Sequence, residues 1–168
     1  MRLIESPVYL SHYLNQSVMS TTSQVSKWRT QAFHKYWLKI TAIVIGSFGP
    51  VFFFGTMIAT MEPARITMDI LSWPLDGMTT FESPDTRFMS ALAGGFLLGW
   101  GVTIWLLSKW VYDHAPEAVR KAVLFGILSW FFLDSAGSIA SGNASNVFFN
   151  TLVLLAGVGP MWRPAIEE

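Results

Sequence analysis

The sequence contains no cysteine, which excludes disulfide bonds, thiolate metal sites, iron–sulfur clusters and cysteine nucleophiles. Charge is also scarce: charged residues make up 13% of the chain, against about 25% in an ordinary soluble domain. Basic and acidic residues are equal in number, eleven of each, so no basic surface suited to nucleic acid is expected. The N-terminal stretch lacks the continuous apolar core and small-residue cleavage site of a signal peptide, so we expect the mature protein to keep it.

Apolar and aromatic residues are what the chain has in abundance. Hydrophobic residues form 52% of its 168 residues, and eight Trp and thirteen Phe help to raise the aromatic share to 15%. A soluble domain of this size has too little interior for so much apolar surface, whereas a bilayer is itself an apolar solvent. Four apolar stretches approach the ~20 residues that a helix needs to cross the hydrocarbon core. We therefore predict a single-domain, all-α membrane protein, a bundle of four transmembrane helices, with spans at about residues 38–61, 88–111, 118–141 and 144–161.

Residues 1–37 precede the first predicted span and mix aromatic with basic side chains, among them Lys27, Trp28, Arg29 and Trp37. Trp and Lys both suit the headgroup region of a membrane. The composition therefore predicts an N-terminal interfacial amphipathic helix that lies on the membrane surface. The alternative is a disordered tail that becomes helical only near the membrane.

The basic residues are distributed unevenly about the predicted spans. Four spans place both termini on one side, which then holds nine of the eleven basic residues, while the other side holds Arg65 and Arg87. The positive-inside bias then predicts that both termini are cytoplasmic.

The second predicted span carries Gly95 and Gly99 at small-xxx-small spacing. Such spacing lets two helix backbones approach closely in lipid, so we expect this face to pack against another helix. The motif is common in apolar segments and indicates packing only.

The strongest anomaly in the spans is Asp134. A charge at the bilayer centre costs ~2.5–3.5 kcal/mol on insertion scales, so such acids usually face a bundle interior and have partners. The third and fourth spans form a hairpin around Gly142, with Asp134 eight positions before this glycine and Asn150 eight positions after it. At 1.5 Å per residue, both lie ~12 Å from the outer end of the hairpin. We therefore expect Asp134 to be buried against the fourth span and to accept a hydrogen bond from Asn150 or a neighbouring serine.

Further polar side chains share these two helix faces, and Arg87 at the outer end of the second span is a candidate to lean into the same patch. The candidate ligand-binding residues are Asp134, Ser138, Asn143, Asn146, Asn150 and Arg87. Two interpretations stay open: the polar groups only tie helices together, as Ser and Asn commonly do in lipid, or they form a ligand or ion site, which an intramembrane acid favours. The many small polar side chains also predict a water-containing vestibule at the outer half of the hairpin.

The sequence offers no recognisable catalytic or cofactor motif. The histidines, His12, His34 and His114, fall outside the predicted spans, so none is placed to ligate haem within the bilayer. No cluster has di-metal spacing, and no Ser-His-Asp set, phosphate loop or dinucleotide glycine pattern appears. We therefore predict no cofactor, no metal and no catalytic residue.

Two segments carry a resemblance to known proteins. They are residues 87–107, RFMSALAGGFLLGWGVTIWLL, and residues 133–164, LDSAGSIASGNASNVFFNTLVLLAGVGPMWRP. In these segments the sequence resembles small uncharacterised bacterial inner-membrane proteins that are DoxX-like in general form. The region of resemblance, from residue 87 to residue 164, covers about half of the chain. The resemblance implies a compact four-helix fold in the bacterial inner membrane, and it implies no activity, cofactor or catalytic residue.

Three functions are compatible with these features. The first is a non-catalytic integral membrane protein, a subunit or assembly partner of a larger membrane complex, which fits the glycine-rich faces and the aromatic–basic arm. The second is a membrane carrier or binding protein for a small molecule, lipid or ion that uses the outward-facing patch around Asp134 and Asn150. The third is a quinone- or lipid-linked membrane enzyme. We prefer them in that order and expect the partners to be the lipid bilayer and other membrane subunits or further copies of this chain, with no nucleic acid.

Overall fold

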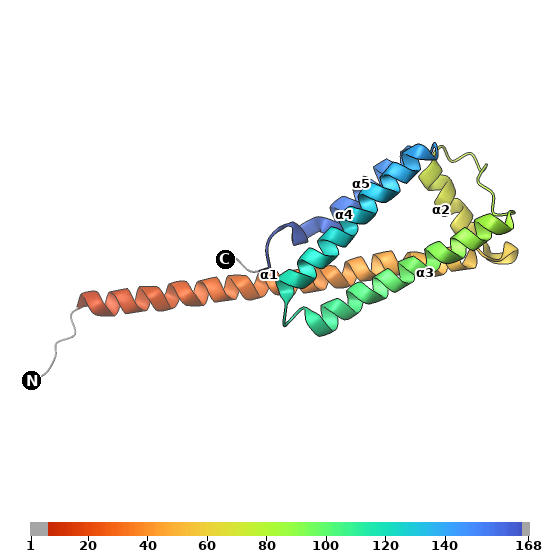
Figure 1. Ribbon diagram of the computed structural model, residues 1–168. Helices are drawn as coiled ribbons and strands as arrows, with labels where there is room; N and C mark the ends of the chain where they lie inside the picture. The colour runs from red at the N-terminus through yellow and green to blue at the C-terminus, as the bar shows by residue number, and fades with distance from the viewer. Residues whose placement is uncertain (1–6, 166–168) are drawn as a thin grey trace, which may run out of the picture.

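A computed structural model describes residues 7–165, with their side chains from residue 18 onward except at 22–23 and 26–29. These residues form five α-helices and three shorter helical segments and contain no β-strand, which confirms the all-α prediction (Figure 1). The α-helices are α1 (Pro7–Phe54), α2 (Glu62–Ser72), α3 (Pro84–Leu106), α4 (Pro116–Ala140) and α5 (Ser145–Val158). The shorter segments are a 3-10 turn at Ile58–Thr60, a π-helical segment at Leu107–Val111 and a 3-10 turn at Gly159–Trp162.

Prolines mark where two of the long helices begin. Pro84 and Pro116 occupy the first turns of α3 and α4, where the missing backbone N–H has no intrahelical partner to lose. The side chain of Ser83 caps α3 by accepting a hydrogen bond from the backbone N–H of Asp85 at 3.2 Å. Glu117 lies in the first turn of α4, at the positive end of the helix dipole.

Three helices of the described chain are long and apolar enough to cross a membrane. They are Thr30–Phe54 within α1, Pro84–Val111 (α3 and its π-helical extension) and Pro116–Ala140 (α4). Helix α1 ends at Phe54, seven residues before the predicted end of the first span at residue 61. The helix stops there because the backbone N–H groups of Gly55 and Thr56 donate to the carbonyls of Phe52 and Phe53, three residues back, in tight turns. The uncharged run to residue 61 therefore marks an apolar segment that is longer than the helix.

The fourth predicted span differs most from its expected form. The α-helix α5 has 14 residues, or about 21 Å at 1.5 Å per residue, and a membrane core is about 30 Å thick. Gly159 has a φ of 35° and ends the helix, after which the chain continues in a 3-10 turn. By length α5 is thus not among the three candidate spans.

The helix α1 is a single continuous helix of 48 residues, about 72 Å long. An arm lying flat on the membrane needs a bend near residue 37, whereas Figure 1 shows the N-terminal half of α1 running straight away from the other helices. The physical reason lies in the sequence, which has no glycine and no proline between Pro7 and Gly46 to break the helix. The described part of the arm, residues 7–37, is thus helical and continuous with the first candidate span, and residues 1–6 of the predicted arm lie outside the described residues.

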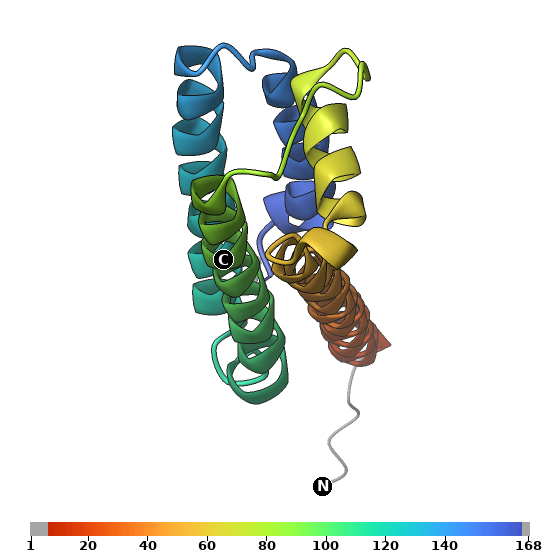
Figure 2. The same cartoon turned by 90° about the vertical axis from the view of Figure 1, so that its right-hand side faces the viewer.

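The helices are arranged as two antiparallel hairpins. Helix α3 packs along α1, and α5 packs along α4. The two hairpins meet at one end and diverge toward the other, where α2 lies between α1 and α5 (Figures 1 and 2). One hydrophobic core fills the end where the hairpins meet: Leu38, Ala42, Ile45, Ile104, Tyr112, Val119, Val123, Ile127 and Met161. A smaller core of Phe52, Ala64 and Phe81 holds α2 against α1 and α3.

Glycines allow α1 and α3 to touch through their backbones. A Cβ atom built on Gly101 lies 2.7 Å from the backbone of Gly46, and one built on Gly94 lies 2.8 Å from the carbonyl oxygen of Gly49. By contrast, a Cβ on Gly95 or on Gly99 has nothing within 4 Å. A close approach of α3 to another helix is therefore present, as predicted. Gly94 and Gly101 make this contact, whereas the predicted pair, Gly95 and Gly99, faces another direction.

This difference gives a matched test. Gly101→Ala should lower the free energy of unfolding by about 1–3 kcal/mol, because its methyl group has no room against α1. Gly99→Ala should leave stability unchanged or raise it by up to about 1 kcal/mol, since alanine is the better helix former. Unfolding of both variants in the same detergent, followed by circular dichroism, measures the difference. Equal effects at the two positions would contradict the α1–α3 contact.

Candidate functional site

The amide groups of two asparagines on α5 converge on Asp134 of α4. Nδ2 of Asn150 donates to Oδ2 of Asp134 at 2.7 Å, and Nδ2 of Asn146 donates to the same oxygen at 3.0 Å. Two charge-assisted hydrogen bonds to one oxygen stabilise a carboxylate and fix its orientation. The structure therefore contains the Asp134–Asn150 hydrogen bond that the helix spacing predicts.

Two serines of α4 complete this network. Asn150 also donates to Oγ of Ser135 at 3.1 Å, and Asn146 also donates to Oγ of Ser138 at 2.9 Å. Each amide nitrogen has two hydrogens, so both are engaged. We call these five residues, Asp134, Ser135, Ser138, Asn146 and Asn150, the carboxylate–amide cluster.

The fold of the hairpin explains why the cluster forms. Gly142 has a φ of 85°, a left-handed conformation that suits glycine, and the N–H of Asn143 returns to the carbonyl of Ser138 at 2.8 Å. This tight turn sets α5 antiparallel to α4, so residues equally far from the turn lie at the same depth. One turn of helix below Asp134, Trp130 contacts Trp100 of α3, with ring centroids 6.3 Å apart.

The cluster retains hydrogen-bond acceptors that no donor satisfies. Oδ1 of Asn146 is buried and has no hydrogen-bond partner among the described residues. Oδ1 of Asp134 accepts none of the hydrogen bonds that the described side chains make, and the ion pairs in this part of the chain all involve other acids. The cluster thus presents a carboxylate and an amide oxygen without a cation of its own.

Two of the predicted site residues lie outside the cluster. Arg87 donates from Nη1 to the carbonyl oxygens of Phe81 and Glu82, so it stabilises the loop before α3, and its expected approach to Asp134 does not occur. Asn143 is exposed and donates to Ser141 within the hairpin turn. Sequence spacing along one helix does not determine where a residue on another helix or in a turn points.

Two surface hollows bear on the predicted vestibule, and one of them reaches the outer half of the α4–α5 hairpin at Ser145. One shallow hollow runs between α1 and α3 and is lined by Ala42, Gly46, Leu98, Gly101 and Trp105 with two neighbouring residues. A second is lined by Trp73, Ser145, Phe148 and Phe149, beside α5. Asn150 and Ser135 are 4% and 7% exposed, so the inner part of the cluster is a closed helix contact.

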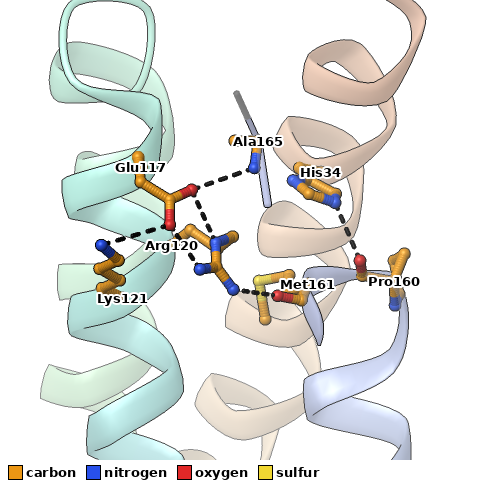
Figure 3. Close-up of polar contacts among 7 residues, drawn as sticks. All are labelled: His34, Glu117, Arg120, Lys121, Pro160, Met161 and Ala165. Atoms are coloured by element: carbon orange, nitrogen blue, oxygen red, sulfur yellow. Dashed lines mark hydrogen bonds and ion pairs between the residues drawn. The ribbon is translucent and has the colours of Figure 1, made fainter. Parts of the chain in front are cut away.

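A second polar cluster, which the sequence analysis missed, lies where the two hairpins meet (Figure 3). Arg120 binds Glu117 through Nε and Nη2 and donates from Nη1 to the carbonyl of Met161 at 2.7 Å. A carboxylate oxygen of Glu117 accepts the backbone N–H of Ala165 at 3.0 Å. His34 of α1, 1% exposed, donates from Nε2 to the carbonyl of Pro160 at 2.9 Å. These contacts fasten the segment after α5 to α1 and α4, and we call them the C-terminal clasp.

His34, which the sequence analysis placed outside the spans, lies on α1 four residues before the buried core residue Leu38. The pair Glu117–Arg120, at i,i+3 spacing, was visible in the sequence, but its further partners are backbone atoms of the C-terminal segment, which no side-chain pattern reveals.

Tyr112 is buried beside the clasp. Its side chain is 2% exposed, and its hydroxyl has no hydrogen-bond partner among the described residues. Burial, followed by the nearby charge of Glu117, raises the pKa of Tyr112 to about 12, so the phenol stays neutral at physiological pH. Its role is packing within the core.

The described side chains include no group of three or more His, Asp or Glu residues that could hold a metal ion. No family model matches the chain, and no curated protein or solved structure matches it. The resemblance to DoxX-like membrane proteins stays a prediction.

The carboxylate–amide cluster can be tested through stability. Asp134→Leu should lower the free energy of unfolding by about 1–2 kcal/mol, because the N–H groups of Asn146 and Asn150 lose their acceptor in an apolar site. Asp134→Asn keeps an acceptor and should cost less. Ala136→Leu, at an exposed position of the same helix, is the control and should be close to neutral. Unfolding in detergent measures all three, and equal stability of the Leu and Asn variants would contradict the network.

The clasp gives a separate prediction. Arg120→Met should cost about 1.5–3 kcal/mol, since it leaves the Glu117 carboxylate half-buried without its cation. The double variant Glu117→Gln/Arg120→Met should be more stable than Arg120→Met alone. Lys121→Met should be nearly neutral, because Lys121 is exposed and lies 3.7 Å from Glu117. Hydrogen exchange at residues 159–165 should accelerate in Arg120→Met, and unchanged protection there would contradict the clasp.

Proposed function

We propose that this protein is a non-catalytic integral membrane protein, a component of a larger membrane assembly, that crosses the bilayer four times with both termini in the cytoplasm. Three apolar helices of spanning length support the membrane location. The bacterial inner membrane is the proposed location on the resemblance alone.

The C-terminal clasp supports a fourth crossing despite the short length of α5. The hydrogen bond from Arg120 to Met161 puts the end of α5 at the depth of Arg120. From the turn at Ser141 back to Arg120, α4 rises about 31 Å, close to the thickness of a membrane core. The chain from Ser145 to Met161 returns over the same depth, because the 3-10 turn adds length after the α-helix.

Exposed methionines at the two ends provide a topology test. Met19 is 71% exposed on the arm, and Met78 is 77% exposed in the loop before α3. The chain has no cysteine, so each methionine can be replaced singly by Cys. In intact cells an impermeant thiol reagent should label Met78→Cys and spare Met19→Cys, and the reverse pattern would overturn the orientation.

The single observation that carries the assembly role is the length of α1. Its 48 residues reach about 72 Å, more than twice the thickness of a membrane core, so its N-terminal half must project from the bilayer. Most helix stability comes from packing rather than from propensity, and Figure 1 shows this half extending away from the other helices. Apolar side chains such as Val25 are 53% exposed on it. A partner that packs against the arm would give it the missing contacts.

Photo-crosslinking tests this role. A photoreactive amino acid placed at Met19 or Val25 of the full chain in native membranes should form adducts with one discrete protein at constant stoichiometry. The same group at Leu133, which is 79% exposed on α4, is the control and should react with lipid. Adducts formed only with a second copy of the chain would indicate a homo-oligomer. Arm positions that form no more protein adducts than Leu133 would contradict the assembly role.

A second candidate function, a ligand-binding membrane protein, is favoured by one specific observation. Asp134 is a carboxylate within a spanning helix whose second oxygen has no donor or cation among the described residues. Intramembrane acids often mark the pathways of ions or substrates. The carboxylate–amide cluster is the proposed site.

A further inference from the structure

The carboxylate–amide cluster contains one acid, Asp134, and no basic side chain of the described chain pairs with it. The four ion pairs join Lys35 to Asp113, Arg65 to Glu62, and both Arg120 and Lys121 to Glu117. Arg87, the basic residue that the sequence analysis placed at this patch, donates instead to two backbone carbonyls. A ligand that completes this site therefore needs a positive charge.

The donors and acceptors of the cluster define the ligand further. The N–H groups of Asn146 and Asn150 are committed to Asp134 and to the two serines. What is left are two acceptors, Oδ1 of Asp134 and Oδ1 of Asn146, which is buried and unpaired among the described residues, together with the hydroxyl hydrogens of the two serines. An ammonium group brings three donors, no acceptor and a positive charge, so it suits these two acceptors beside an acid that has no basic partner.

The depth and surroundings of the cluster favour a lipid. Asp134 lies seven residues before the turn at Ser141, or about 10 Å along α4, in the outer third of the roughly 31 Å that separates Ser141 from Arg120. Leu133, next to Asp134 in α4, and Phe148, on α5, have side chains 79% and 63% exposed. A hollow lined by Trp73, Ser145, Phe148 and Phe149 lies on the same helix as Asn146, and three of its four residues are apolar, as an acyl chain requires.

We propose that the carboxylate–amide cluster binds a primary ammonium group, with Asp134 as its counter-ion, and that the group belongs to the headgroup of an aminophospholipid of the phosphatidylethanolamine type. The proposal deepens the second candidate function and rests on it. A free amine of the same chemistry is the alternative source. Choline headgroups carry the charge but no N–H, so the site should discriminate against them.

Native mass spectrometry of the full chain, released from nanodiscs, provides the test. The lipids share their acyl chains and differ in the headgroup amine, from ethanolamine through its mono- and dimethyl forms to choline. Lipid retention should fall with each N–H removed and differ by at least about tenfold between the ends of the series. Equal retention across the series would overturn the ammonium assignment. This measurement needs no variant, so it does not depend on the folding of a mutant.

Two variants assign the effect to the cluster. Asp134→Asn is nearly isosteric, removes the charge and should abolish the preference for ethanolamine. Asp85→Asn, on an exposed acid in the first turn of α3, is the matched control and should keep it. A preference that persists in Asp134→Asn would place the lipid elsewhere and overturn the site.

The remaining outcomes separate the source of the amine from the proposed function. Millimolar ethanolamine that displaces the lipid and stabilises the protein alone would indicate a free amine and overturn the lipid source. Binding that depends on Asp134 but not on the amine would overturn the ammonium assignment and leave the ligand-binding function standing. Retention of every tested lipid and amine that is equal in wild type and Asp134→Asn would overturn both.

Discussion

Arg120 joins the two helix hairpins, and the depth of everything on α5 depends on this contact. Its guanidinium binds Glu117 on its own helix and the carbonyl of Met161 beyond α5. The last carbonyls of a short helix lack intrahelical partners, and in an apolar environment such groups must find donors. Arg120 and His34 supply them. Arg120 and His34 thus fix the C-terminal end of α5, and the turn at Gly142 fixes its N-terminal end. Helix α5 therefore cannot slide along α4, and Asn146 and Asn150 are held beside Asp134.

How far the site could be predicted follows from this geometry. Asp134 and Asn150 could be paired from the sequence because one tight turn separates them, and helical rise alone then equates their depths. Arg87 could not be placed, since it follows a loop whose own carbonyls, at Phe81 and Glu82, compete for its guanidinium. The all-α class was equally predictable, because apolar stretches of this length leave few alternatives in lipid.

Other features depend on contacts that no local pattern contains. Gly94 and Gly95 are adjacent and chemically identical, and the rotation of α3 about its axis decides which of them meets α1. That rotation is set by the packed side chains of both helices together. The ion pair between Lys35 and Asp113 is a further contact of this kind, because it joins residues 78 positions apart in the chain.

The two polar clusters differ in a way that bears on function. In the C-terminal clasp the charges of Arg120 and Glu117 cancel, and their hydrogen bonds go to each other and to the backbone at Met161 and Ala165. The charges of this cluster balance without a ligand, although Nδ1 of His34 and the hydroxyl of the neighbouring Tyr112 are buried without a partner among the described residues. In the carboxylate–amide cluster Oδ1 of Asn146 is likewise unpaired, and Asp134 has no basic partner among the described residues. Unpaired buried atoms thus occur at both ends of the molecule, and the acid without a basic partner is what distinguishes the carboxylate–amide cluster. This difference in charge therefore argues that the diverging, α2-covered end of the molecule, rather than the clasped end, is where a ligand binds.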